Sequence, residues 1–312
     1  MKIISLEQIK AVLPSLDLIP AIETGFVSYS AGRAVVPPVG ELLLDTGDVH
    51  IKYGYLKEEP YYVIKIASGF YQNPQFGLPS SNGLMLLFNQ KTGELVSILL
   101  DEGHLTNIRT AVAGAIAARH LAPQKVQRIG IVGTGTQAHL QLEYLLPVTA
   151  CRQALVWGRG PEQLARYQRE MEPFGFVIET SQNLADILRS CNLVVTTTPA
   201  GAPLLQATDL QPGTHLTAVG SDTPEKQELD AAILGRADVI VADSIGQCLE
   251  RGEIHQAIQA GQITPDDIVE LGDVIAGKVA GRTSDEQITV ADLTGVAVQD
   301  INIATAVFEA LS

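Results

Sequence analysis

The 312-residue chain predicts an α/β fold of two domains, on the strength of three features of its sequence. The first is the stretch 128–138 (Arg-Ile-Gly-Ile-Val-Gly-Thr-Gly-Thr-Gln-Ala), in which a short apolar strand runs directly into a glycine turn and a helix. The second is a series of six strand-like runs with helical spacers between 128 and 242. The third is the series of prolines that separates short helix-like and strand-like runs in the first hundred residues. Together they predict a Rossmann-type nucleotide-binding domain plus a second α+β domain.

The glycine turn matches a site for the pyrophosphate of a dinucleotide. Gly133 ends the strand, Gly135 lets the backbone approach a phosphate, and Ala138 is small enough for the helix to pack on the strand. Thr136 and Gln137 open the helix, whose unpaired N–H groups and positive dipole end would face the phosphates. A purely structural turn is the alternative, but the strands that follow favour the nucleotide site.

Hydrophobic periodicity and turn residues place the elements in order. Strands of the nucleotide domain are expected at 128–133, 154–157, 176–179, 193–198, 215–220 and 239–242. In the first domain we expect helices at 6–13 and 18–31 and strands at 41–44, 49–55, 61–67, 84–89 and 95–100. An Ala-rich helix, 110–120, would lead into the nucleotide domain, and a last helix would return to the first. The expected domains are therefore 1–117 with 296–312, and 118–295.

Composition favours an ordinary globular protein. Hydrophobic residues make up 46% and charged residues 18% of the chain, and no apolar run reaches membrane-spanning length. The start lacks the apolar core of a signal peptide, so we expect a cytoplasmic protein without a membrane partner. The net charge of -14 argues against nucleic acid, because an acidic surface repels phosphate backbones. Cys151, Cys191 and Cys248 have no metal-ligand spacing, so free thiols and no metal site are expected.

Asp222 is the polar residue that stands out in the nucleotide domain. It follows the expected strand 215–220, and ligands of such domains bind at the carboxyl ends of the strands. An isolated carboxylate there could act as a general acid or base. The alternative is a helix N-cap, since Asp before Thr-Pro is also a common helix start. We expect Asp222 to handle a proton, and the two roles could coexist.

Three cations stand out in the first domain: Arg33, Lys65 and Arg109. Lys65 is embedded in an apolar strand, although charged residues are rarely buried without a partner. A solvated lysine on an exposed sheet face is the alternative. Arg109, beside the Ala-rich helix, could bind a carboxylate bidentately or merely pair with Asp101 or Glu102.

The end of the second nucleotide-domain strand bears on the choice of cofactor. NAD sites carry an acidic residue there, which binds the ribose 2′-hydroxyl. Here Trp157 is followed by Gly158-Arg159-Gly160, with no acid. Arg159 could instead meet a 2′-phosphate, so NADP(H) is favoured. NAD(H) stays open, because arginine can also stack on adenine without discriminating.

These positions together resemble the ornithine cyclodeaminase and mu-crystallin family over essentially the whole chain. The motifs that carry the resemblance are Arg33-Ala-Val-Val-Pro37, Val63-Ile-Lys65, Asn107-Ile-Arg109-Thr-Ala111, 133–138, 219–224, 227–230 and 294–300. The resemblance implies that Arg33, Lys65 and Arg109 clamp a substrate carboxylate, and that Lys65 and Asp222 are catalytic.

The resemblance has further implications for cofactor and assembly. It adds Thr110, Val219 and Gly295 to the cofactor-binding residues. It also assigns substrate binding and homodimer formation to the first domain, with the nicotinamide between the two domains of each subunit.

The resemblance implies a nicotinamide-dependent oxidoreductase acting on a small amino or imino acid, either a cyclic ketimine reductase or an amino acid dehydrogenase. The alternative is ornithine cyclodeaminase, a lyase that converts L-ornithine to L-proline and ammonia with recycled NAD. Asp222 matches the acidic position of cyclodeaminases and alanine-type dehydrogenases, whereas mu-crystallin carries a small hydroxyl residue there. A third interpretation, a non-catalytic binding protein, is disfavoured by the retained Arg33, Lys65, Arg109 and Asp222.

Overall fold

The structure is a computed structural model that describes residues 1–70 and 72–312. Contacts within the chain divide it into unit 1, Met1–Arg109 with Val296–Ser312, and unit 2, Thr110–Gly295. The sequence predicts the first boundary after residue 117, whereas the contacts place it between Arg109 and Thr110. No loop marks this point, because helix α3 (His104–Leu121) runs through it unbroken and begins earlier than its Ala-rich stretch suggests.

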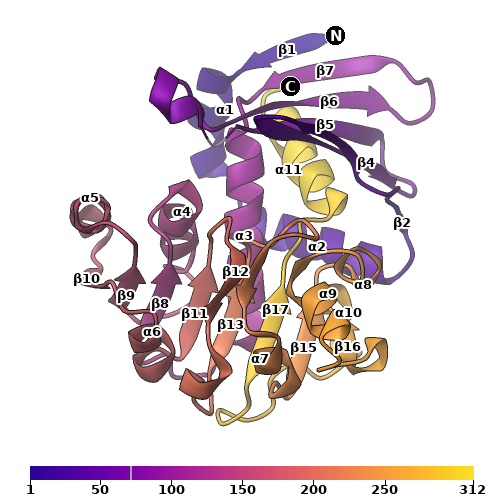
Figure 1. Cartoon of the computed structure of the whole chain (residues 1–312). Helices are drawn as coiled ribbons and strands as arrows, with labels where there is room; N and C mark the ends of the chain where they lie inside the picture. Colours follow the sequence, from indigo (N-terminus) through magenta and orange to yellow (C-terminus); the bar gives the residue numbers. More distant parts are fainter. Residues whose placement is uncertain (71) are drawn as a thin grey trace. The chain divides into compact units, whose positions relative to one another are not determined.

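Unit 1 is built on a mostly antiparallel sheet in the order β1-β7-β6-β5-β4-β2, with β3 also paired to β4. Its described strands are β1 (Lys2–Ser5), β2 (Ala34–Val35), β3 (Gly40–Leu44), β4 (Gly47–Leu56), β5 (Tyr61–Gly69), β6 (Ser81–Asn89) and β7 (Leu95–Leu100). Its helices are α1 (Leu6–Val12), α2 (Leu18–Ser30) and α11 (Ala297–Ala310). The last helix, yellow in Figure 1, packs against β4, β5 and α2. Residues from both ends of the chain therefore form one core.

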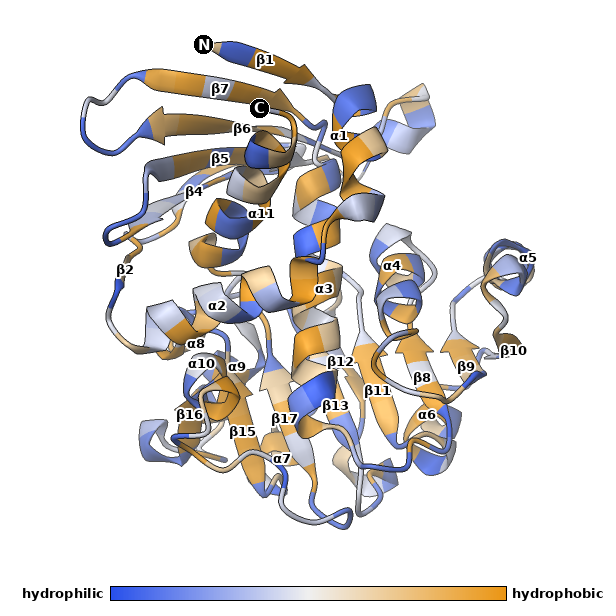
Figure 2. Cartoon of the chain, turned by 180° about the vertical axis from the view of Figure 1, so that it is seen from behind, coloured by the Kyte–Doolittle hydropathy of each residue, from blue (hydrophilic) through white to orange (hydrophobic). Residues whose placement is uncertain are grey.

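Unit 2 is built on a parallel sheet in the order β10-β9-β8-β11-β13-β17-β15-β16. Its described strands are β8 (Ile129–Val132), β9 (Gln153–Trp157), β10 (Val177–Ser181), β11 (Leu193–Thr196), β13 (His215–Ala218), β15 (Val239–Ala242), β16 (Ile268–Glu270) and β17 (Thr289–Asp292). A small parallel pair, β12 (Gly201–Leu205) and β14 (Gln227–Leu229), lies apart from this sheet. The central strands are buried along their length, and β8 and β11 are mostly orange in the hydropathy view of Figure 2.

Helices connect the parallel strands of unit 2. They are α4 (Thr136–Tyr144), α5 (Pro161–Met171), α6 (Ala185–Ser190), α7 (Ala231–Gly235), α8 (Ile245–Cys248), α9 (Gly252–Gln259) and α10 (Leu271–Ile275). The order β10-β9-β8-β11-β13 reverses direction between β8 and β11, which creates a crevice at their carboxyl ends. Sequence analysis missed β17 because its polar ends, Thr289 and Asp292, leave only two apolar residues between them.

No single helix of the described residues is long and apolar enough to span a membrane, although the bent pair Leu6–Ser15 and Leu18–Ser30 reaches that length and composition jointly. The three cysteines are free thiols. Among the residues described, no three His, Cys, Asp or Glu side chains group in a way that could hold a metal ion.

Candidate functional site

The glycine turn between β8 and α4 has the backbone geometry that a phosphate needs. Gly133 has φ +123°, and a Cβ there would lie 2.6 Å from Thr197 Oγ1. Around Gly135, by contrast, a Cβ would meet no described atom within 4 Å. Helix α4 begins at Thr136 without a side-chain cap, and the first N–H groups of a helix have no partner within the helix itself. The turn can therefore accept an anion through its backbone.

A cavity of about 310 Å³ adjoins this turn at the carboxyl ends of β8, β9 and β11. It is lined by Gly133, Thr134, Gly135, Trp157, Gly158, Arg159, Thr197, Thr198, Pro199, Ala200 and Leu204. These strands flank the point where the strand order reverses, which is where open parallel sheets bind ligands. Arg159 is exposed, and it is the charged side chain of this lining.

Helix α4 is held in place by buried polar contacts. Ala138 is buried, and its carbonyl accepts a hydrogen bond of 2.8 Å from the hydroxyl of Tyr167. Gln141 Nε2 donates to Gln137 Oε1 (3.4 Å) and to the carbonyl of Thr110 (3.1 Å). The structure thus brings Gln137 and Thr110 together around Gln141, in support of the helix that follows the turn.

Asp222 lies four residues beyond β13, in a segment that turns at 223–225 and enters β14. The described segment starts no helix, so the helix-cap alternative is wrong. Asp222 Oδ1 lies 2.6 Å from Lys226 Nζ, and its side chain is 39% exposed. Val219, which precedes this segment, is buried and donates its N–H to the carbonyl of Thr196 (3.1 Å). This partly exposed carboxylate lies at the carboxyl ends of the strands, where domains of this kind bind ligands.

Sequence reasoning missed the role of Glu228, a fully buried carboxylate in β14. Its Oε1 accepts hydrogen bonds from the N–H (2.6 Å) and the hydroxyl (2.8 Å) of Thr198, and its Oε2 accepts one from the N–H of Gly220 (2.9 Å). Burial raises the pKa of Glu228 to about 7, although these hydrogen bonds favour the charged form. No sequence signal predicts this, because Thr198 lies 30 residues away along the chain.

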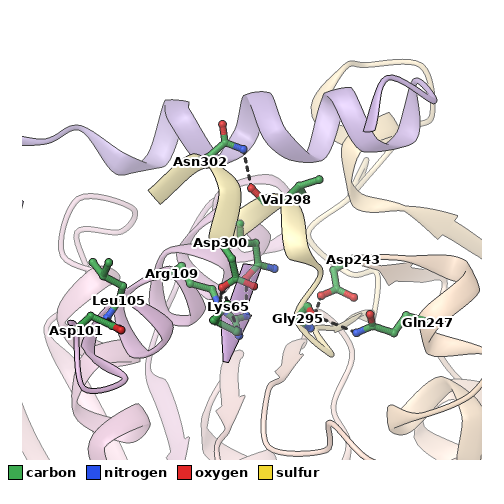
Figure 3. A network of polar contacts seen from close by, with 11 residues as sticks. Lys65, Asp101, Leu105, Arg109, Asp243, Gln247, Gly295, Val298, Asp300 and Asn302 are labelled. Carbon is green, nitrogen blue, oxygen red and sulfur yellow. Dashed lines mark hydrogen bonds and ion pairs between the residues drawn. The ribbon is translucent and has the colours of Figure 1, made fainter. Parts of the chain in front are cut away.

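Gly295 is held by hydrogen bonds to the buried Asp243 and the half-buried Gln247. It has φ +85°, its N–H donates to Asp243 Oδ2 (2.7 Å), and its carbonyl accepts from Gln247 Nε2 (3.2 Å), as Figure 3 shows. Gly295, Thr110 and Val219 do not belong to the lining of the cavity described above.

Unit 1 holds a buried ionic group formed by Lys65, Arg109 and Asp300 (Figure 3). Asp300 Oδ1 lies 3.1 Å from Lys65 Nζ and 3.1 Å from Arg109 Nε. Arg109 Nη1 also donates to Gln299 Oε1 at 2.7 Å. Lys65 is only 1% exposed, so the interpretation as a solvated lysine is wrong. Arg109 forms its ion pair with Asp300 rather than with Asp101 or Glu102, and the carboxylate of Asp101 accepts the backbone N–H of Leu105.

The surroundings of Lys65 lower its pKa to about 7. Burial is the largest cause, followed by the positive charge of Arg109, while Asp300 and its hydrogen bond oppose the shift. Lys52, itself buried, stands directly opposite Lys65 on β4 and lowers its pKa further. Lys65 can therefore exchange a proton near neutral pH. The two cations of the ionic group, Lys65 and Arg109, have the chemistry to bind a carboxylate.

Arg33 is not part of this ionic group. It is exposed, and its Nη2 donates to Ser28 Oγ at 3.3 Å, near the end of α2. No hydrogen bond or ion pair given for the described residues joins Arg33 to Lys65 or Arg109.

The parallel sheet of unit 2, whose strand order changes direction between β8 and β11, and the cavity at its glycine turn define a Rossmann-type nucleotide-binding domain. With unit 1 as a second α+β domain, the protein has the α/β fold that the sequence predicts. The chain belongs to the ornithine cyclodeaminase/mu-crystallin family, whose profile matches residues 2–312. The resemblance seen in the motifs is thereby confirmed.

Three relatives show the range of this family. An uncharacterized cyclodeaminase (y4tK) of Sinorhizobium fredii is 43% identical, with 99% of this chain and 95% of the relative covered. A solved archaeal alanine dehydrogenase dimer with bound NAD is 34% identical, with a TM-score of 0.91 and coverages of 99% and 95%. The Δ(1)-pyrroline-2-carboxylate reductase of Thermococcus litoralis, solved with NADH and L-proline, is 26% identical, with a TM-score of 0.94 and coverages of 99% and 97%.

Proposed function

We propose that the protein is a nicotinamide-dependent oxidoreductase that reduces the imine of a small amino acid, or a cyclic ketimine, and catalyses the reverse oxidation. The buried Lys65–Asp300–Arg109 group carries this proposal. Two cations share a single carboxylate away from water, so a substrate carboxylate would add a second, favourable counter-charge. The solved relatives that bind NAD or NADH also act on, or hold, small amino acids according to their names.

The residues of unit 2 fit a dinucleotide. The open space at Gly135 and the first turn of α4, with Thr136, suit a pyrophosphate, while Gly133, at φ +123°, lets the chain turn tightly against Thr197. When bound, the nicotinamide supplies or accepts a hydride. Arg159 would hold the adenosine ribose end, and we propose that it favours a 2′-phosphate, hence NADP(H). NAD(H) is the alternative, supported by the cofactors named for the two solved relatives.

The side chains have separate tasks in the proposed reaction. Arg109 and Lys65 bind the substrate carboxylate, and Arg33 is the third proposed ligand although it stands apart in the described contacts. Lys65 also carries a proton that can leave near neutral pH. Asp222 delivers the proton that the imine nitrogen takes up, and removes it in the oxidative direction. Thr110, Val219 and Gly295 support the cofactor site from the backbone rather than from the cavity lining.

Ornithine cyclodeaminase activity is the second candidate, because a 43% identical relative is named a cyclodeaminase. The two reactions differ in what happens to the hydride. An oxidoreductase changes the nicotinamide absorbance at every turnover, whereas a cyclodeaminase releases ammonia without net change. Assays should pair alanine, proline and ornithine with each oxidised cofactor, and pyruvate plus ammonia or pyrroline-2-carboxylate with each reduced one. Turnover with absorbance change supports the proposal, and ammonia release without it refutes the proposal.

We also propose that unit 1 forms a homodimer. On β3, three consecutive leucines are exposed: Leu42 (56%), Leu43 (77%) and Leu44 (52%). A strand that packs on one face alternates between buried and exposed residues, so a continuous exposed run is typical of a surface covered by a partner. Light scattering after gel filtration should give a dimer, and Leu43→Lys should shift it toward monomer.

A further inference from the structure

Two loops of unit 2 meet at one carboxylate. The first, 197–200, follows β11 and lines the cavity beside the glycine turn. The second, 219–222, follows β13 and ends at Asp222. Glu228 binds Thr198 in the first loop through Oε1 and Gly220 in the second through Oε2. The same side chain therefore determines the position of both loops.

The two loops are in close contact and have little room to move closer together. A Cβ on Gly220 would lie 2.1 Å from the carbonyl oxygen of Thr198 and 2.6 Å from Glu228 Oε2. Thr197 continues the chain of contacts, because its hydroxyl donates to the carbonyl of Val132 (3.0 Å) and lies where a Cβ of Gly133 would point. A displacement of Thr198 would thus reach the glycine turn.

The backbone of Glu228 is itself fixed by hydrogen bonds to a second buried side chain. Glu253, also buried, accepts the backbone N–H groups of Glu228 (2.7 Å) and Leu229 (3.1 Å). Ser221 Oγ donates to the carbonyl of Lys226 (2.6 Å) and closes the turn that carries Asp222. The strand that presents Glu228 and the turn before it are therefore fixed relative to each other.

We propose that Glu228 is a positioning residue, which holds the Thr198 edge of the cavity and the backbone before Asp222 in a single geometry. The inference rests on the proposed function, in which the cavity binds the nicotinamide cofactor and Asp222 moves the proton. Cofactor affinity and the proton step then depend on one carboxylate that does not itself line the cavity. An amide cannot replace it, because Gln would turn an NH₂ group toward one of the three donors and leave that donor unpaired.

The test compares Glu228→Gln with the control Asp230→Asn. Asp230 lies two residues further along and caps α7, accepting the N–H of Ala232 at 3.1 Å. For Glu228→Gln we expect a cofactor Kd raised about tenfold and a kcat lowered about tenfold, with little change in the substrate KM. Asn keeps an oxygen that can cap α7 but not the second oxygen, which accepts the N–H of Ala207 at 3.3 Å, so Asp230→Asn should lower the melting temperature modestly and leave Kd and kcat near wild type. If both variants lose only thermal stability, Glu228 has a structural role alone and the inference fails.

A second pair of variants decides the matter if Glu228→Gln does not fold. Thr198→Val removes the hydroxyl that Glu228 binds, whereas Thr198→Ser keeps it. Cofactor Kd and kcat should both worsen in the valine variant and recover in the serine variant; equal behaviour of the two would overturn the inference. A wild-type protein that binds NADPH or NADH but shows no net redox turnover contradicts the proposed function, and the Kd comparison then still tests Glu228. A wild type that binds neither cofactor refutes both.

Discussion

Asp300 Oδ1 lies 3.1 Å from Lys65 Nζ, so the final helix of the chain supplies the counter-charge for a lysine in the middle of the unit 1 sheet. The same oxygen is 3.1 Å from Arg109 Nε. This relationship gives the last helix a direct part in the electrostatics of the proposed substrate site.

Removing that counter-charge should destabilise the protein. Asp300→Asn leaves Lys65 and Arg109 buried without their carboxylate, and breaking a buried ion pair from one side typically costs about 3–5 kcal/mol. Urea unfolding at neutral pH measures the change. The double variant Asp300→Asn/Lys65→Met should recover part of the loss, since it removes one uncompensated cation. An Asp300→Asn protein as stable as wild type would show that the pair contributes nothing.

Deprotonation of Lys65 should make kcat/KM fall at high pH. Its pKa of about 7 means that the cation needed for the substrate carboxylate is lost as pH rises through that value. We expect kcat/KM to fall above about pH 7 in wild type, and this fall to move to higher pH in Lys65→Arg, whose side chain stays charged. Two substitutions test the substrate site directly. Lys65→Met and Arg109→Leu should each raise the substrate KM or abolish turnover, while the cofactor Kd stays unchanged. Wild-type kinetics in either variant would remove that residue from the site.

Arg159→Ala should weaken NADPH binding selectively. The exposed guanidinium lines the cavity after β9, where no acidic residue stands to bind a ribose 2′-hydroxyl. Loss of a charged hydrogen bond to the 2′-phosphate should cost roughly 1–3 kcal/mol for NADPH and little for NADH. Fluorescence titration of both cofactors into wild type and variant measures this. Equal losses for both, or a wild-type preference for NADH, would disprove the NADP(H) assignment.

Asp222→Asn should lose most of kcat and keep its stability. A positioned general acid typically contributes about 100- to 10,000-fold, and an amide cannot transfer the proton. The pair with Lys226 is partly exposed and no helix is capped, so the melting temperature should change little. Lys226→Met is the matched control, because it breaks the pair but retains the carboxylate. Normal turnover in Asp222→Asn would mean that another group moves the proton.

The buried carboxyl of Glu253 should make the protein less stable as pH rises. Burial raises its pKa from 4.5 to about 8, so between these values the folded protein keeps a proton that the unfolded chain has lost. The resulting stabilisation is fully present below about pH 4.5 and is lost as pH rises through about 8. Glu253→Gln should therefore show a flatter dependence of unfolding free energy between pH 5 and 8. Parallel curves for the two proteins would contradict this.

The sequence by itself determined the features that depend on neighbouring residues. The strand, glycine turn and helix of 128–138 were predictable because each step follows from local side chains: apolar residues, then two glycines, then an open helix start. The strands around Lys65 were likewise predictable from alternation and turns. In contrast, β1 and β17 were missed, because β17 has polar residues at both ends and β1 pairs with β7, which lies far along the chain.

Only the tertiary structure decided which polar groups meet. Alternation marked Lys65 as unusual, but its burial and its pKa depend on Arg109 and Asp300, which reach it from other elements. Glu228 gave no signal at all, since its meaning comes from Thr198 and Gly220 at the ends of two different strands. The physical reason is the distance along the chain over which residues interact. Strand and helix patterns depend on residues a few positions apart. The protonation and stability of a buried charged group depend on partners that only folding brings within hydrogen-bonding distance.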